Sequence, residues 1–300
     1  MNMNKKKTVV LSDSTSDLSP ELIEEYGVAI SPLTVVLGDE SHLDGIDITP
    51  DDVYDYYKSC GKLAKTTATN MAEHQEFIAK NVPEDAEAVY FTISSEMSTT
   101  YNNARLAAED NDRVYVIDSK NLSTGIGLLV LHACDLAEEG KSAKEIYDEI
   151  NSLVNKVDAS FVVDTLEFLH KGGRCSSVAA LGANLLKLRP LIQVKDGKMS
   201  VVKKYRGKMT DVLKQYVNEK LAEENKFIGK RLFVTHSGGC EQIALELKEI
   251  TEKAYPDKQV IITRAGCTVS CHCGPGTLGI LGIREKLRVG QRQFMRLNFI

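Results

Sequence analysis

The chain has 300 residues, of which 43% are hydrophobic and 26% charged, and its 37 basic and 42 acidic side chains leave a formal net charge of −5. This balance argues against nucleic acid as the main partner, and the lack of an apolar run of about 18 residues argues against stable membrane insertion. The seven cysteines are scattered, which is typical of reduced thiols, and the first residues lack the apolar core of a signal peptide, so we expect a cytoplasmic protein.

Strands, polar loops and helices alternate through the first half of the chain. An apolar run at 8–11 ends in the hydroxyl-rich, acidic segment 12–17, and the same order recurs after 88–93 and after 114–117. This order predicts an open, mostly parallel sheet that binds its ligand at the carboxyl ends of the strands. The other helices predicted here lie at 19–26, 71–80, 126–139 and 143–154, with one more that begins at 49 and one that ends at 108. An extended run at 28–37 is expected to pair with a run at 43–48.

The second half of the chain predicts another α/β unit. No Pro- or Gly-rich linker separates the halves, and we place the boundary between an N-terminal domain of residues 1–157 and a C-terminal domain of residues 158–300. Asp196-Gly197 predicts the turn of a hairpin. The elements predicted here are strands at 161–163, 191–194, 199–205, 232–235 and 260–263 and helices at 165–171, 178–187, 211–224 and 241–255. The fold class is therefore α/β, with two domains.

A histidine near the end of the chain is the first candidate for function. His272 lies between two cysteines and is followed by Gly274-Pro275-Gly276; because glycine and proline break both regular periodicities, we expect His272 on a loop. Two hydroxyl-rich segments, 65–70 and 94–101, lie where strands run into loops. Hydroxyls, backbone N–H groups and an imidazole together suit a small anionic head group such as a carboxylate.

The same hydroxyls leave a catalytic alternative open. A triad of Ser98, His272 and Asp118 would make the protein a hydrolase or acyltransferase acting on a lipid-like substrate. Neither Ser95 nor Ser98 lies in a G-x-S-x-G elbow, which is the motif that would specify this chemistry. Capping of the helix that begins near Thr99 accounts for the same hydroxyls without catalysis.

Two further clusters have both a functional and a structural interpretation. Cys271, His272 and Cys273 are good metal ligands, but zinc sites use a second pair that this chain lacks; two buried thiols beside a histidine are the alternative. Arg206 belongs to the basic cluster 203–208, which indicates a solvated strand edge or a cation that turns inward to meet an acid. Arg174 follows Gly172-Gly173, where a helix C-cap is expected.

Several segments, taken together and in this order, resemble the motifs of the DegV family of bacterial fatty-acid-binding proteins. Each motif is short, and their common order over nearly the whole chain, to about Gly282, carries the resemblance. The matching segments are Asp13-Ser14-Thr15-Ser16-Asp17-Leu18, Lys65-Thr66, Ser98-Thr99-Thr100-Tyr101-Asn102-Asn103-Ala104, Asp118-Ser119 with 125–128, 165–174, Arg189-Pro190-Leu191-Ile192 and His272-Cys273-Gly274-Pro275-Gly276.

The resemblance implies two α/β domains with a long-chain fatty acid in a cleft between them. Its tail would be buried, and its carboxylate would be held by Thr66, Ser98 and His272, with Ser95 in the same ligand-binding group and Arg206 as a nearby cation. Fatty acid is then the ligand, and neither a cofactor nor a metal is expected. Because each buried CH₂ contributes about 0.8 kcal/mol, a long tail supplies ample affinity once the charged head is satisfied.

The resemblance also implies a partner protein. The family member binds a fatty acid without being an enzyme and presents the carboxylate to a separate fatty acid kinase, and Arg174 would belong to the surface that the kinase contacts. The sequence departs from the family motifs at 67–70, at Thr99, where glycine is usual, and at Cys273, where threonine is common. A β-branched residue at position 99 is costly if φ is positive there. These departures all touch the predicted head-group site.

Overall fold

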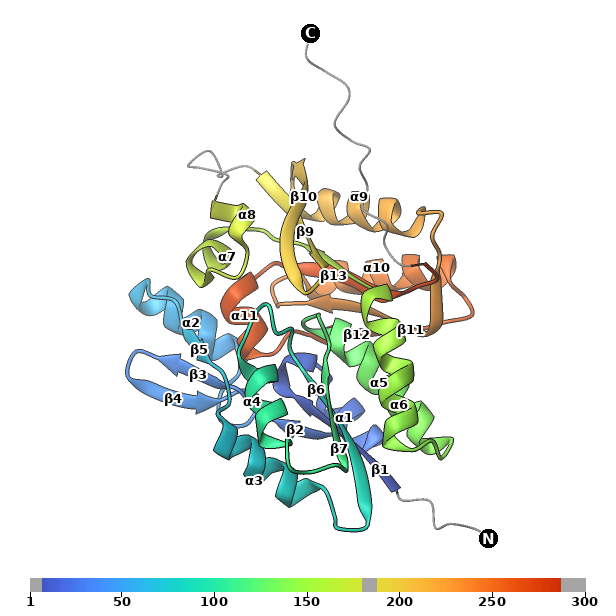
Figure 1. The fold of residues 1–300 in the computed structure, drawn as a ribbon. Helices are drawn as coiled ribbons and strands as arrows, with labels where there is room; N and C mark the ends of the chain where they lie inside the picture. Colours follow the sequence, from blue (N-terminus) through green and yellow to red (C-terminus); the bar gives the residue numbers. More distant parts are fainter. Residues whose placement is uncertain (1–6, 180–187, 287–300) are drawn as a thin grey trace.

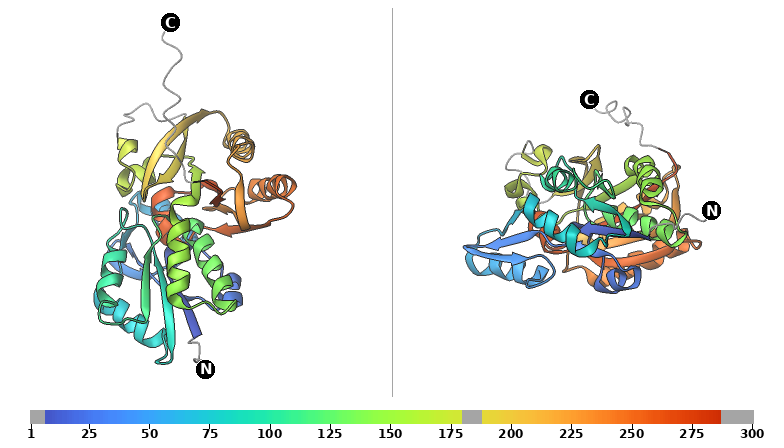
Figure 2. Two further views of the ribbon diagram at one scale, coloured as in Figure 1. Left: turned by 45° about the vertical axis from the view of Figure 1, so that its right-hand side comes forward. Right: turned by 60° about the horizontal axis from the view of Figure 1, so that its bottom comes forward.

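The computed structural model describes residues 7–179 and 188–286, which form a four-stranded, a three-stranded and a six-stranded sheet with helices packed around them (Figure 1). The first two sheets come from the first half of the chain, drawn blue to green, and the third comes from the second half, drawn yellow-green to red (Figures 1 and 2). The predicted α/β class is confirmed. No helix in these two ranges combines the length and apolarity that crossing a bilayer requires.

The four-stranded sheet is parallel throughout, which confirms the predicted mostly parallel sheet, and its strand order is β2-β1-β6-β7. Its elements are β1 Lys7–Asp13, η1 Ser14–Ser16, α1 Pro20–Tyr26, β2 Ala29–Ser31, α3 Met71–Asn81, β6 Ala86–Thr92, α4 Thr100–Ala107, β7 Val114–Asp118, α5 Thr124–Glu138, α6 Ala143–Leu153 and η2 Val154–Lys156. Alternate strand residues point to opposite faces. Val10 and Val89 therefore pack with α5 on one face, while Leu11 and Tyr90 pack with α3 and α4 on the other.

The three-stranded sheet is antiparallel and comprises β3 Thr34–Leu37, β4 Glu40–Leu43 and β5 Lys65–Thr67, with α2 Pro50–Cys60 between the last two strands. The sequence predicted one extended run at 28–37, and this was wrong. Pro32 and Leu33 break the run, so β2 joins the parallel sheet and β3 the small one. Proline cannot donate to a strand ladder, which explains the break.

The six-stranded sheet has the order β10-β9-β8-β13-β11-β12, in which only β11 and β12 run parallel. Its elements are β8 Val157–Val162, α7 Glu167–Gly172, α8 Ser176–Ala179, β9 Leu188–Lys195, β10 Lys198–Arg206, α9 Met209–Leu221, β11 Phe227–His236, α10 Glu241–Ala254, β12 Gln259–Arg264, α11 Cys267–Cys273 and β13 Leu278–Arg284. The hairpin around Asp196-Gly197 is confirmed. Strand β13 was not predicted, and the helix predicted at 178–187 lies mostly outside the described residues.

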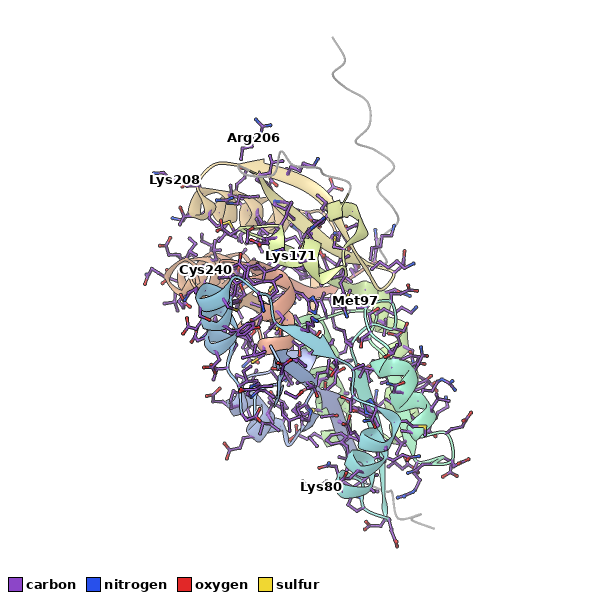
Figure 3. All side chains as sticks on the ribbon, turned by 90° about the vertical axis from the view of Figure 1, so that its left-hand side faces the viewer. Lys80, Met97, Lys171, Arg206, Lys208 and Cys240 are labelled. Carbon is purple, nitrogen blue, oxygen red and sulfur yellow. The ribbon has the colours of Figure 1, made fainter. Side chains whose placement is uncertain are left out.

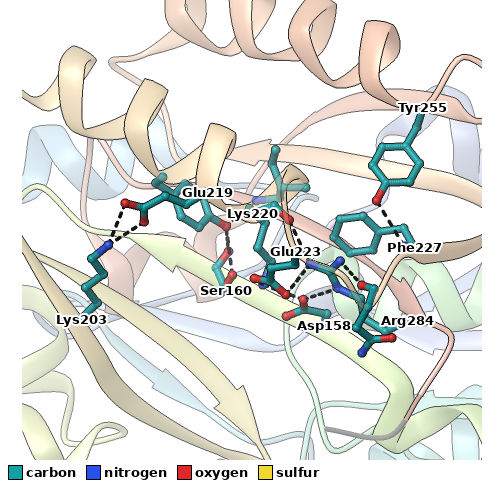
Figure 4. A network of polar contacts seen from close by, with 12 residues as sticks. Asp158, Ser160, Lys203, Glu219, Lys220, Glu223, Phe227, Tyr255 and Arg284 are labelled. Atoms are coloured by element: carbon teal, nitrogen blue, oxygen red, sulfur yellow. Dashed lines mark hydrogen bonds and ion pairs between the residues drawn. The ribbon is translucent and has the colours of Figure 1, made fainter. Parts of the chain in front are cut away.

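A buried charge cluster fixes β13 beside β8 (Figure 4). Arg284 Nε donates to Asp158 Oδ2 over 2.8 Å, and Lys220 Nζ of α9 lies 2.6 Å from the same oxygen. The Arg284 guanidinium also lies over the ring of Phe227, with 3.6 Å between its Cζ and the ring centroid. Buried charges are stable only when they are paired, so this cluster favours the observed order of the central strands.

The two halves of the chain share a core. Helix α5 contacts both the parallel sheet and strands of the six-stranded sheet, and Arg231 of β11 donates to both carboxylate oxygens of Asp135 of α5 over 2.7 and 2.8 Å. Phe161 of β8 and Ile126 of α5 belong to one hydrophobic cluster. The predicted boundary after residue 157 falls at the start of β8, and the division into two domains stays a prediction.

Candidate ligand-binding site

Thr66 and His272, which are 206 positions apart in the sequence, are joined by a hydrogen bond of 2.9 Å between Oγ1 and Nε2. Thr66 is the middle residue of β5 and pairs with Val35 of β3. His272 belongs to α11, which packs against α2 and α7 as well as the small sheet. The small sheet of the first half and a helix of the second half therefore meet at this pair.

His272 does not lie on a loop, as the sequence predicted, but in the last turn of α11. The helix ends at Cys273 because Gly274 adopts φ 71°, in the region that side chains rarely adopt. A Cβ on Gly274 would also lie 2.6 Å from the Phe168 ring. The Gly-Pro-Gly segment thus terminates the helix directly after the histidine and does not prevent its formation.

A cavity lies beside the Thr66–His272 hydrogen bond, and Ser98 lines it as well. A second cavity shares four of its lining residues, Leu122, Phe161, Val269 and Cys273. The two cavities thus adjoin. Small-molecule sites are mostly apolar with a few placed polar groups, and the lining of the first cavity has this composition.

The polar and apolar residues lie at different depths in these cavities. Thr66, Ser98 and His272 are partly buried, and Arg174, which also lines the first cavity, is exposed. Phe161 is 7% exposed, and Leu281, which lines the second cavity, only 3%. The polar end is therefore nearer the surface, and the walls become apolar with depth.

The imidazole of His272 is held in its neutral form. Burial, and to a smaller extent the positive charge of Arg174, lower the pKa of His272 to about 4. Its Nδ1 has no hydrogen-bond partner among residues 7–179 and 188–286 and lies against Gly172, where a Cβ would come within 2.4 Å of it. Neutral His272 can donate or accept one hydrogen bond at Nε2, depending on its tautomer.

Ser98 lies in the loop after β6 and participates in the start of α4. Its Oγ accepts from the backbone N–H of Thr100 over 3.2 Å and is 2.8 Å from Thr100 Oγ1. The N-cap of α4 is Thr99, which makes no side-chain cap, so Ser98 supports the first residue of the helix from the preceding loop. Thr99 has φ −78°, and a β-branched residue is therefore unstrained where glycine is usual in the family motif.

Ser95 does not reach the cavity lining. Its Oγ donates to Asp118 Oδ2 over 2.5 Å and its N–H donates to Oδ1 over 3.1 Å, so Ser95 ties the loop after β6 to the end of β7. The hydrogen bonds recorded for Asp118 come from this serine and from the N–H of Lys120, not from His272. The triad of Ser98, His272 and Asp118 is not assembled in the described structure.

The two predicted cations occupy different places. Arg174 lines the cavity, with its Nη1 donating to Gly172 O over 2.7 Å. Arg206 is exposed at the end of β10, opposite Leu188 of β9, and Figure 3 shows it far along the six-stranded sheet from Met97, which lines the cavity. Arg206 lines neither of the two cavities, because its strand carries it to solvent.

The cysteines beside His272 face different surroundings. Cys273 lines both cavities, whereas Cys271 packs in a separate cluster with Val35 and Cys267. Burial raises the pKa of the Cys273 thiol to about 12, so it is neutral. Within the described ranges, no three His, Cys, Asp or Glu side chains come together as a metal site.

Some residues of the cavity were not predicted from the sequence. Met97, Phe161 and Met199 line it, yet each comes from a different element and has neighbours typical of an ordinary core. Cys273 could have been inferred from its place beside His272. The methionines have no signal of their own, because a flexible apolar side chain fills a core and a ligand cavity equally well.

The fold and the cavity together define an α/β protein with an internal cavity that is polar at its outer end and apolar further in. The chain belongs to the DegV family: the family model described as an uncharacterised protein of the DegV family matches residues 7–285. A DegV domain-containing protein of Staphylococcus aureus is 30% identical over 284 residues, which cover 93% of this chain and 99% of that protein.

Solved structures of the family have the same fold. A fatty-acid-binding DegV family protein from Thermus thermophilus matches with a TM-score of 0.82 and 28% identity, covering 93% of this chain and 99% of its own. A DegV lipid-binding protein from Thermotoga maritima matches with a TM-score of 0.80 and 29% identity, covering 94% and 100%. Both of these structures are named for the binding of a fatty acid or lipid.

Proposed function

We propose that this protein binds one long-chain fatty acid in the two adjoining cavities, between the halves of the chain, and presents its carboxylate to a partner fatty acid kinase. The observation that carries the proposal is the Thr66–His272 hydrogen bond at the outer end of a cavity whose walls become apolar with depth. The fatty acid binding of the Thermus relative supports the choice of ligand.

The head group would be held by neutral donors. Thr66, Ser98 and His272 each line the outer cavity and each can donate a hydrogen bond to a carboxylate oxygen. Hydrogen bonds to a charged group contribute about 1.5–3 kcal/mol each, which offsets the cost of removing the carboxylate from water. The negative charge would in turn favour protonation of His272.

The tail would pass between Leu122, Phe161, Val269 and Cys273 into the second cavity. Each buried CH₂ contributes about 0.8 kcal/mol, so the deeper part of the site supplies most of the affinity and the outer part supplies the orientation. A carboxylate at the outer end is near the protein surface, where a second protein can reach its oxygens.

Arg174 would lie on the surface that the kinase contacts. It is exposed and lines the outer cavity, so a partner that reaches the carboxylate also reaches this guanidinium. Arginine suits such a place because it pairs with carboxylates and phosphates in a two-pronged geometry. The catalytic alternative has no support from the geometry, since Asp118 is paired with Ser95.

The direct test is native mass spectrometry of the protein purified from bacteria, followed by extraction and identification of the bound lipid. We expect one fatty acid per chain, and we expect the delipidated protein to take up one equivalent of a long-chain acid. If no lipid accompanies the protein and the delipidated form takes up none, the proposal is wrong.

A further inference from the structure

A buried aspartate joins the two segments that carry Thr66 and His272. Asp44, 4% exposed, follows β4 of the small sheet. Its Oδ1 accepts from the N–H of Cys267 over 2.8 Å, and its Oδ2 accepts from the N–H of Thr268 over 3.1 Å and from Ser14 Oγ over 3.0 Å. The first turn of α11 is thereby attached to the small sheet, of which Thr66 is also a member.

A second carboxylate extends this attachment by one residue. Asp17 Oδ1 accepts from the N–H of Gly266 over 2.9 Å, and its Oδ2 accepts from Ser123 Oγ over 2.5 Å. Gly266 is the N-cap of α11 and, because it has no side chain, cannot provide a side-chain hydrogen-bond acceptor for the first turn of the helix. The first N–H groups of a helix lack partners within it, and here carboxylates from the first half of the chain accept from three consecutive ones.

The approach of these carboxylates depends on a glycine. A Cβ on Gly266 would lie 3.0 Å from Asp17 Oδ1 and 3.4 Å from Asp44 Oδ1. Glycine therefore lets two acidic side chains reach one helix end. The interaction is also favoured electrostatically, because the N-terminal end of a helix is partially positive.

The other end of the short helix carries the imidazole. His272 lies four residues, or about 6 Å along the axis, beyond Thr268, and the Gly172 backbone limits its movement on one side. A shift at the first turn of a seven-residue helix is transmitted to its last turn because the helix is nearly rigid over that length. The position of His272 relative to Thr66 then depends on Asp44.

We propose that Asp44 is a positioning residue for His272: it sets the distance between the imidazole and Thr66, and through it the affinity for the carboxylate. This rests on the proposed function, because the effect on affinity presupposes a fatty acid at this pair. Asp44 touches the backbone of α11 and lines neither of the two cavities, so its action is indirect.

The test compares Asp44→Asn with Asp135→Asn. Asp135 is also a buried carboxylate with strong hydrogen bonds, but it lines neither of the two cavities. We expect Asp44→Asn to weaken the binding of palmitate at least tenfold, and Asp135→Asn to lower stability while leaving palmitate affinity within twofold. Palmitate affinity within twofold of wild type in Asp44→Asn would overturn the proposal.

A double-mutant cycle separates positioning from general destabilisation. If Asp44 acts through the Thr66–His272 pair, the double variant of Asp44→Asn and Thr66→Val should lose less palmitate affinity than the product of the two single fold-losses. The double variant of Asp135→Asn and Thr66→Val should lose the full product. Multiplicative losses in the Asp44 cycle would contradict the positioning role.

NMR of the ligand-free protein tests positioning without any lipid. The His272 ring resonance, assigned by its disappearance in His272→Gln, should shift in Asp44→Asn and stay in place in Asp135→Asn. A wild type that binds no fatty acid refutes the proposed function, while the ring resonance still decides whether Asp44 positions His272.

A second variant serves if Asp44→Asn does not fold. Ser14→Ala removes one hydrogen-bond donor to Asp44 and should shift the His272 resonance in the same direction by a smaller amount. An unchanged resonance would refute the positioning role.

Discussion

The ring of His272 lies directly on the backbone of Gly172, where a Cβ would come within 2.4 Å of Nδ1. The next residue, Gly173, has φ 70° with nothing within 4 Å of a Cβ. The two adjacent glycines of the 165–174 motif therefore serve different purposes. Gly172 makes room for the imidazole, and Gly173 supplies the left-handed turn that ends α7.

These two glycines make a matched pair for mutation. Gly172→Ala should push the imidazole away from Thr66 and lower fatty acid affinity at least tenfold. Gly173→Ala should cost about 1 kcal/mol of stability through backbone strain and change affinity by less than threefold. Isothermal titration calorimetry and thermal melts of both variants check this. Equal affinities of the two variants would contradict the assignment.

The low pKa of His272 predicts a pH-dependent stability. The imidazole has a pKa of about 4 in the folded protein and about 6.5 when unfolded, so between these values the unfolded state binds the proton more tightly. The contribution of His272 is complete above pH 6.5 and is lost as the pH falls towards 4. The difference in unfolding free energy between wild type and His272→Gln should therefore fall over this window in denaturant titrations.

Bound fatty acid should reduce that loss. A carboxylate beside His272 stabilises the imidazolium and raises its pKa, so binding should take up protons near pH 5–6. Calorimetry at one pH in two buffers of different protonation enthalpy measures this uptake. Equal uptake by wild type and His272→Gln would assign the protons to another group.

Removal of a hydroxyl that lines the cavity should weaken fatty acid binding, whereas removal of the neighbouring hydroxyl outside the cavity should not. Thr66→Val and Ser98→Ala each remove a donor to the carboxylate and should weaken binding by about tenfold or more, since one such bond is worth about 1.5–3 kcal/mol. Ser95→Ala removes a hydrogen bond to Asp118 and should lower stability without changing affinity. A direct binding assay with a fluorescent fatty acid and a melt of each variant provide the comparison.

Fatty acid affinity and the rate of phosphorylation should distinguish the roles of Arg174 and Arg206. Arg174→Ala should keep fatty acid affinity within about fivefold, because exposed charge pairs contribute at most about 1 kcal/mol, yet it should slow phosphorylation by the partner kinase. Arg206→Ala should change neither, since Arg206 is exposed at the end of β10. A full phosphorylation rate with Arg174→Ala would remove Arg174 from the partner surface.

Cys273 lies where the two cavities adjoin, so a larger side chain at this position should leave room only for a shorter acyl chain. We expect Cys273→Leu to shift the preference of the protein towards shorter acyl chains, measured by competition among saturated acids of different length. Cys271→Leu is the control, because it overpacks a core cluster without lining either cavity and should cost about 1–3 kcal/mol of stability. An unchanged preference in Cys273→Leu would mean that the tail does not pass this residue.

The residues of the site were predictable to the extent that local motifs mark them. Thr66, Ser98 and His272 stand in motifs that resemble those of a family, and they line one cavity. Arg206 was a candidate because it lies in a basic cluster. The direction of its side chain depends on the register shift between Val201 and Lys203 in the β9–β10 hairpin, and the turn motif alone does not reveal that shift. Asp44 was missed because its partners are backbone groups of a helix more than two hundred residues away.

Strand β13 was missed because its neighbours in the sheet pack closely against two glycines. Gly279 and Gly282 made 278–284 a poor candidate for a strand. A Cβ on Gly279 would lie 2.5 Å from Ser160 O, and one on Gly282 would lie 2.4 Å from Leu232 Cδ2. These glycines are needed by the neighbours of β13 in the sheet, and that requirement is tertiary.

The central place of β13 also bears on how the protein is made. Strands β8 and β11 both pair with β13, so they leave the ribosome long before the strand that separates them is synthesised. The second cavity includes Phe161 of β8 and Leu281 of β13, and its wall is complete only when this late strand has been inserted. A nascent chain that still lacks β13 therefore has an incomplete wall at the second cavity.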